Sequence, residues 1–105
     1  MLEKLNSRAF SEQLHTTFHL RTTGSAPLAL ELIEVADKNS SPTLEYFSLI
    51  FRGPLTPHFA QATYTMEHEK LGTFDLFIVP LGPDSAGMRY EVIFNRMRPV
   101  PNPAV

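Results

Sequence analysis

The central half of this chain alternates apolar residues with other residues in a period of two, and the alternation breaks only at turn-forming residues. The alternating positions are Phe47, Leu49, Phe51, Ala62, Tyr64, Met66, Phe74, Leu76, Ile78, Tyr90, Val92 and Phe94. The breaks fall at Gly53–Pro54, Leu71–Gly72 and Pro80–Asp84. Because successive side chains of a β-strand point to opposite faces, this period predicts a sheet with one buried face.

Short strands separated by turn residues extend over most of the chain. We predict strands at Thr16–Thr23, Leu28–Ala36, Leu44–Arg52, Gln61–His68, Thr73–Val79 and Met88–Asn95. This spacing is typical of a mainly β protein, here a small antiparallel six-stranded barrel or sandwich. Between the fourth and fifth strands, Gly72 ends a short hairpin connection and is expected to adopt positive φ.

The second predicted strand contains a fault in its alternation. Leu30 and Leu32 share one face, whereas Ile33 and Val35 take the other parity. One extra residue at Leu32–Ile33 would restore the pattern, so a β-bulge is expected there. A helix is the alternative for this segment, because Leu, Ala and Glu favour helices.

The two ends of the chain differ from its centre. Ser7 could cap a short helix at Arg8–Leu14, which would lie across the sheet or plug an open end. The C-terminal segment 98–105 has alternate prolines, at Pro99, Pro101 and Pro103. They predict an extended arm that lies on its own domain or on a neighbouring subunit. The predicted organisation is therefore one β domain at 1–97 and a Pro-rich tail at 98–105.

Composition narrows the possible functions. The 105 residues fit one domain, and the absence of cysteine excludes disulfides, thiolate metal sites and cysteine nucleophiles. A net charge of −2 provides no basic field for nucleic acid. No apolar run suits a secretory signal or a membrane span, so we expect a cytoplasmic protein without Sec export. The chain could still belong to an assembly that acts outside the cell. No cofactor is predicted.

Four segments together resemble a known group of proteins. They are Phe47–Pro54, Gln61–His68, Leu71–Pro80 and Tyr90–Asn95, and their order resembles that of a family of small bacterial β-rich domains of unassigned function. The likeness extends from about Phe10 to Asn95. Domains of the family that the chain resembles are often encoded beside proteins that resemble phage-tail collars and tail fibres. The resemblance therefore implies a structural or accessory role in a tail-like assembly.

His68 lies in the most enzyme-like part of the sequence, between Glu67 and Glu69. A regular strand places the two glutamates on one face and His68 on the other, so the three side chains do not converge on a metal. A bend in the hairpin would permit a His–carboxylate pair. We favour a hydrogen-bonded structural histidine, and we predict neither a catalytic residue nor a metal site.

Arg52 and three tyrosines are the candidates for binding a ligand or a partner. Arg52 at a strand end could bind an anion or a partner carboxylate, and the alternative is an ion pair with Glu67 or Glu91. Tyr46, Tyr64 and Tyr90 join Arg52 as expected contacts in the mouth of a barrel. This arrangement would suit a small molecule or a carbohydrate.

Apolar residues on the outward parity indicate a different function. They are Ile50, Phe77, Val79 and Ile93. If they align across adjacent strands they form an exposed apolar face of the kind that marks an interface, unless the N-terminal helix or a second layer covers it. With the proline arm, they predict a non-enzymatic interaction or assembly domain that binds a protein partner or forms a homo-oligomer. A carbohydrate- or small-molecule-binding barrel is the alternative.

Overall fold

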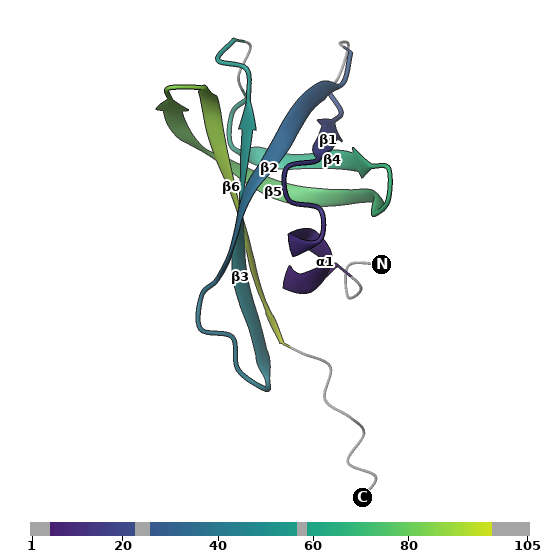
Figure 1. Cartoon of the computed structure of the whole chain (residues 1–105), viewed down its shortest axis with the longest axis vertical. Helices are drawn as coiled ribbons and strands as arrows, with labels where there is room; N and C mark the ends of the chain where they lie inside the picture. Colours follow the sequence, from purple (N-terminus) through teal and green to yellow (C-terminus); the bar gives the residue numbers. More distant parts are fainter. Residues whose placement is uncertain (1–4, 23–25, 57–58, 98–105) are drawn as a thin grey trace, which may run out of the picture.

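The computed structural model describes residues 5–22, 26–56 and 59–97, and in these ranges one short helix precedes six antiparallel strands. The elements are α1 (Ser7–Ser11), β1 (Thr17–Leu20), β2 (Leu28–Asp37), β3 (Leu44–Gly53), β4 (Ala62–His68), β5 (Gly72–Asp84) and β6 (Gly87–Met97). The strands close into a barrel in the order β1-β2-β3-β6-β5-β4 (Figure 1). The predicted fold class is confirmed, and the closed ring selects the barrel. The tail prolines Pro99, Pro101 and Pro103 lie outside the described residues.

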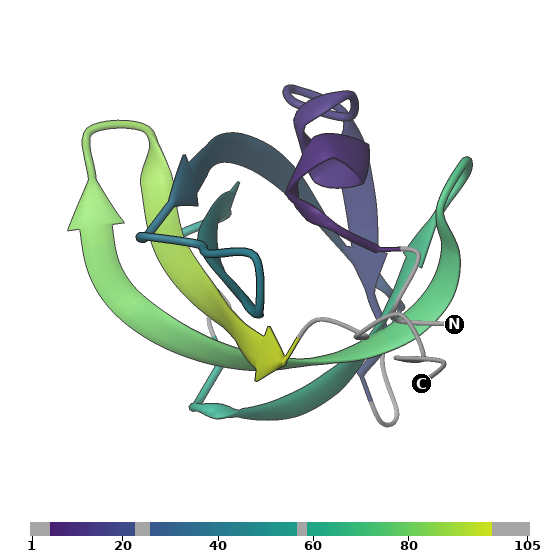
Figure 2. The ribbon, with the colours of Figure 1, turned by 90° about the horizontal axis from the view of Figure 1, so that it is seen from below.

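Strand β5 forms the corner of the barrel, because its two halves pair with different neighbours. Its first half pairs with β4 and its second half, from Val79, pairs with β6 (Figure 2). The prediction that β5 ends at Val79 is wrong, since the strand continues to Asp84. Pro80 is tolerated because it lies at a register irregularity between Pro80 and Gly82, where Leu81 is the extra residue.

The predicted bulge in β2 is confirmed. The pairing with β3 shifts between Leu32 and Glu34, which leaves Ile33 as the extra residue. The helical alternative for this segment is wrong, because all of Leu28–Asp37 is strand. The bulge restores the alternation on each side and bends β2 around the barrel.

Helix α1 closes one end of the barrel with a single aromatic side chain. Phe10 is completely buried and lies 5.5–6.3 Å, between ring centroids, from four other phenylalanines. They are Phe18, Phe47, Phe74 and Phe94. The helix is shorter than predicted, and Asn6 rather than Ser7 is its cap, because the Asn6 Oδ1 accepts a hydrogen bond from the Ala9 N–H.

A partly buried ion pair lies at the same end of the barrel. Glu45 and Arg96 face each other across β3 and β6, and the Arg96 Nε donates to the Glu45 Oε1 at 2.9 Å. The Arg96 guanidinium also donates to the backbone carbonyl of Leu5 and lies over the Phe94 ring. The pair therefore ties the segment before α1 to the β3–β6 ladder.

The ring closes between β1 and β4, and this seam is its shortest ladder. Only two residue pairs, His19 with Glu67 and Leu20 with Met66, join these strands in the described part of the chain. One further backbone bond runs from the Arg21 N–H to the Thr65 carbonyl. By contrast, β3 and β6 pair without interruption over the whole length of β3.

Candidate functional site

The outer surface of β5 and β6 carries exposed apolar side chains. Phe77 is 51 % exposed, Leu81 42 % and Ile93 46 %, and Val79 is half-buried between Phe77 and Leu81 on β5. We call these four residues the outer apolar face. They are exposed although the interior is filled by completely buried aromatic residues, so they are not needed to complete the core.

The strand register explains why these side chains share one surface. Val79 lies directly opposite Glu91, and cross-strand partners point to the same side of a sheet. Phe77 and Ile93 lie two residues from this pair on their own strands, so they project from the same side. Helix α1 packs on the inner side through Phe10 and does not cover this face.

One residue of the predicted interface does not contribute. Ile50 is only 9 % exposed, so its prediction as a surface contact is wrong. It lies in the middle of the sheet, opposite Glu34 on β2 and Glu91 on β6, and these longer side chains flank it on both sides. Phe77, Val79 and Ile93 keep the outward orientation that was predicted, and the bulge residue Leu81 adds to them.

Two charged residues on β6 border the outer apolar face. Arg89 lies opposite Gly82 and the half-buried Glu91 lies opposite Val79, so both point outward. The Arg89 Nε is buried and has no hydrogen-bond partner within the described ranges. Buried polar atoms are paired in the great majority of proteins, so an unpaired guanidinium nitrogen needs an explanation.

Arg52 is held inside its own domain. Its Nε and Nη2 donate to the Asp84 Oδ2 at 3.1 and 2.7 Å. The expected ion pair with Glu67 or Glu91 is wrong, because Asp84 at the end of β5 is the acid that binds Arg52. The hydrogen bond from Arg52, joined by bonds from the Ala86 and Gly87 N–H groups, lowers the pKa of Asp84 to about 2. Asp84 therefore links the β5–β6 turn to β3.

The sequence contains a signal for this turn that the strand pattern alone does not reveal. Asp84 is followed three residues later by Gly87, the pattern of a tight turn in which an Asp side chain accepts from the backbone beyond it. The prediction that Pro80–Asp84 breaks the sheet is wrong, because these residues form the second half of β5 and the turn comes after Asp84.

His68 is buried, with both ring nitrogens hydrogen-bonded. Its Nδ1 accepts from the backbone N–H groups of Lys70 and Leu71 at 3.0 and 3.2 Å. Its Nε2 therefore carries the proton and donates to the Thr16 Oγ1 at 2.8 Å, and Thr16 donates onward to the Gln13 carbonyl. Burial lowers the pKa of His68 below its ordinary value of 6.5. This arrangement matches a structural histidine that caps the β4–β5 turn.

The three tyrosines do not come together with Arg52. Tyr90 is completely buried, and its hydroxyl accepts from the Phe59 N–H at 3.1 Å, so its prediction as a ligand contact in the mouth of the barrel is wrong. Tyr46 lies on the outer side of β3, opposite Asn95. Tyr64 alone lines a pocket. The predicted ligand site in the barrel mouth is therefore not assembled from these residues.

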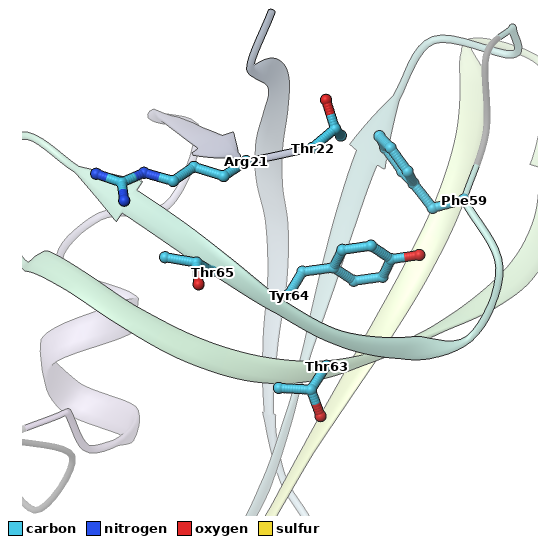
Figure 3. Close-up of a pocket in the computed structure, with 6 residues that line it drawn as sticks. All are labelled: Arg21, Thr22, Phe59, Thr63, Tyr64 and Thr65. Carbon is cyan, nitrogen blue, oxygen red and sulfur yellow. The ribbon is translucent and has the colours of Figure 1, made fainter. Parts of the chain in front are cut away.

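The pocket at Tyr64 lies between β4 and the residues that follow β1 (Figure 3). It has a volume of about 450 Å³ and is lined by Arg21, Thr22, Phe59, Thr63, Tyr64 and Thr65. The Phe59 and Tyr64 rings lie 5.4 Å apart, and the Tyr64 hydroxyl donates to the Ala60 carbonyl. The Arg21 guanidinium extends away from these rings toward Glu67, with which it forms an ion pair.

Within residues 5–22, 26–56 and 59–97, no group of three or more His, Cys, Asp or Glu side chains could hold a metal ion. Among the helices in these ranges, none has the length and apolar character needed to cross a membrane.

The described elements define a small closed antiparallel β-barrel domain with a helix at one end. The chain belongs to the family described as Domain of unknown function (DUF6916), whose model matches residues 5–94. No curated protein and no solved structure matches the chain.

Proposed function

We propose that this chain is a non-enzymatic interaction and assembly domain that docks on other protein through the outer apolar face. The observation that carries the proposal is the exposure of Phe77, Leu81 and Ile93 beside a core that is already complete. Large exposed apolar side chains on a small domain are stabilised when a partner removes them from water.

A finer proposal places the domain in a tail-like or other multi-subunit assembly. It is supported by the resemblance of the four strand segments to small domains associated with tail structures, and by the low content of charged residues, 19 % against roughly 25 % in an average domain. A barrel without long strand edges would serve such an assembly as a rigid connector.

The test is a capture experiment with matched surface variants. The immobilised domain, Phe77→Lys and Thr73→Lys are each exposed to a lysate of the producing cells, and bound proteins are quantified. Thr73 is exposed on the same strand and the same side as Phe77, so it controls for the added charge. We expect a protein that wild type and Thr73→Lys retain and Phe77→Lys loses. Equal capture by all three would contradict the proposal.

A second candidate function is the binding of a small molecule or carbohydrate in the pocket at Tyr64. The favouring observation is the pairing of the Phe59 and Tyr64 rings beside threonine hydroxyls, since aromatic rings provide apolar platforms and hydroxyls provide hydrogen bonds. Titration with a panel of sugars, followed by amide chemical shifts, tests it. Binding that Tyr64→Ala abolishes and Tyr46→Ala preserves would support this candidate over the docking role.

A further inference from the structure

We propose that the outer apolar face is a two-fold self-association surface, on which a second copy of this chain docks with Arg89 of each copy against Glu91 of the other. This inference rests on the proposed function and names the partner. A surface that binds its own copy must be self-complementary, because the two-fold axis places the same patch on both sides.

Unpaired charges are the first observation that supports a second copy. Neither the Arg89 nor the Glu91 side chain forms a hydrogen bond or ion pair within the described part of the chain. The Arg89 Nε is itself buried, so a docking molecule would reach the outer nitrogens of the guanidinium. The adjacent Arg52 is already bound to Asp84, so Asp84 has its own cation. A carboxylate brought by a docking molecule would pair with the outer guanidinium nitrogens of Arg89, and Glu91 supplies a carboxylate on the same surface.

The register of β6 supplies the symmetry. Arg89 and Glu91 flank Tyr90, which pairs with Pro80 on β5. Consider a two-fold axis that lies in the plane of the interface, runs perpendicular to the strands and passes over the Tyr90–Pro80 pair. This axis places each residue on one side of the pair opposite a residue on the other side in the second copy. It therefore brings Arg89 onto Glu91 of the second copy, and Glu91 onto Arg89 of the second copy.

The same axis matches the apolar residues of β5. Val79 precedes Pro80 and the bulge residue Leu81 follows it, so the axis brings Leu81 of one copy onto Val79 of the other. One symmetry operation thus pairs Arg89 with Glu91 and Val79 with Leu81, and it leaves Phe77 and Ile93 at the two edges of the contact. The net charge of −2 per chain opposes this approach only weakly.

The experiment is sedimentation equilibrium of the full chain across a concentration series, with a charge exchange. The variants are Glu91→Arg, Arg89→Glu, the double exchange, and Glu69→Arg, which makes the same charge change at an exposed turn position remote from the face. We expect the wild-type mass to rise with concentration from 11.8 kDa toward twice that value. Each single exchange should weaken dimerisation at least about tenfold, and the double exchange should restore it to within about threefold. Glu69→Arg should behave as wild type.

Leu81→Ser and Leu55→Ser form a second matched pair, because both leucines are exposed and only Leu81 belongs to the face. Circular dichroism confirms that each variant is folded. Monomer mass at all concentrations would overturn the inference, as would single exchanges no more harmful than Glu69→Arg, or a double exchange that fails to restore the dimer. If the chain is monomeric and still captures another protein in a Phe77-dependent way, the inference that a second copy is the partner is wrong. The proposed function would then still hold.

Discussion

The rings of Phe47 and Phe94 stack face to face across the β3–β6 ladder, with centroids 4.6 Å apart and planes within 6° of parallel. Phe10 from α1 packs against both rings, so this stack joins the helix to the longest ladder of the barrel. This cluster of aromatic rings therefore lies at the end of the barrel that α1 closes.

Phe94→Ala should lower the free energy of unfolding by about 3–5 kcal/mol, because the substitution leaves a cavity beside the two remaining rings. Phe77→Ala removes the same atoms from an exposed position and should cost less than about 1 kcal/mol. Urea denaturation of both variants checks the prediction. A similar cost at the two positions would show that the interior described above is not the core.

Stability should fall with acidification around the ordinary pKa of histidine. The pKa of buried His68 is lowered in the folded chain, so the unfolded chain binds the proton more readily. The contribution of neutral His68 is fully present above pH 6.5 and is lost as the pH falls from 6.5 through the lowered folded pKa. Urea denaturation between pH 8 and pH 5 measures this slope.

The His68 variants separate this effect from that of other histidines. His68→Ala should reduce the slope and should cost at least about 2 kcal/mol at pH 8, because two backbone N–H groups lose their acceptor. His15→Gln changes an exposed histidine paired with Glu31 and should leave most of the slope intact. If His15→Gln removes the slope and His68→Ala does not, the assignment to His68 is wrong.

Asp84→Asn should lower the melting temperature at neutral pH, since it weakens the bond to Arg52 and two backbone N–H bonds. The pKa of Asp84 is lowered from 3.8 to about 2, so its contribution is present above pH 3.8 and is lost as the pH falls toward 2. The difference in melting temperature between wild type and Asp84→Asn should shrink over this window. Asp75 is exposed, and among the described residues its carboxylate accepts a hydrogen bond from Thr65, so Asp75→Asn should have the smaller effect at neutral pH.

Two glycine substitutions should rank in a fixed order. Gly72 has φ +89° and open space around it, so Gly72→Ala should cost about 1 kcal/mol of backbone strain. A Cβ at Gly87 would clash with the backbone carbonyl of Gly53, so Gly87→Ala should cost clearly more. Thermal unfolding of the two variants provides the comparison. The reverse order would contradict the described packing of the β5–β6 turn on β3.

The strands could be predicted because the alternation of apolar and other residues along the sequence follows the alternation of buried and exposed side chains. Phe47 and Phe94 fall on the inward parity and are buried, and even the fault at Ile33 corresponds to a real bulge. Tyr90 also falls on that parity, so its buried position was available from the pattern that predicted the strand. Gly72 adopts the positive φ that its place in the hairpin predicted.

The site could be predicted only in part, because it depends on register. The exposure of Phe77 and Ile93 follows from parity, but the outward place of Leu81 depends on a bulge next to Pro80. Asp84 can bind Arg52 only because β5 continues to Asp84. The length of β5 could not be predicted, because Pro80 and Pro83 within it are typical of turns. Sequence also gives no means to recognise that Arg89 lacks a partner.

The seam between β1 and β4 has a consequence for how the ring is held shut. With two residue pairs at this junction, main-chain bonding contributes little to closure. The tilted contact of Phe18 with the His68 ring, 4.2 Å between centroids, and the burial of Leu20 against the interior instead lock the first strand in place. At its shortest ladder this small barrel is thus held closed mainly by packed side chains. Closure of the ring depends more on the aromatic core than on backbone hydrogen bonds between β1 and β4.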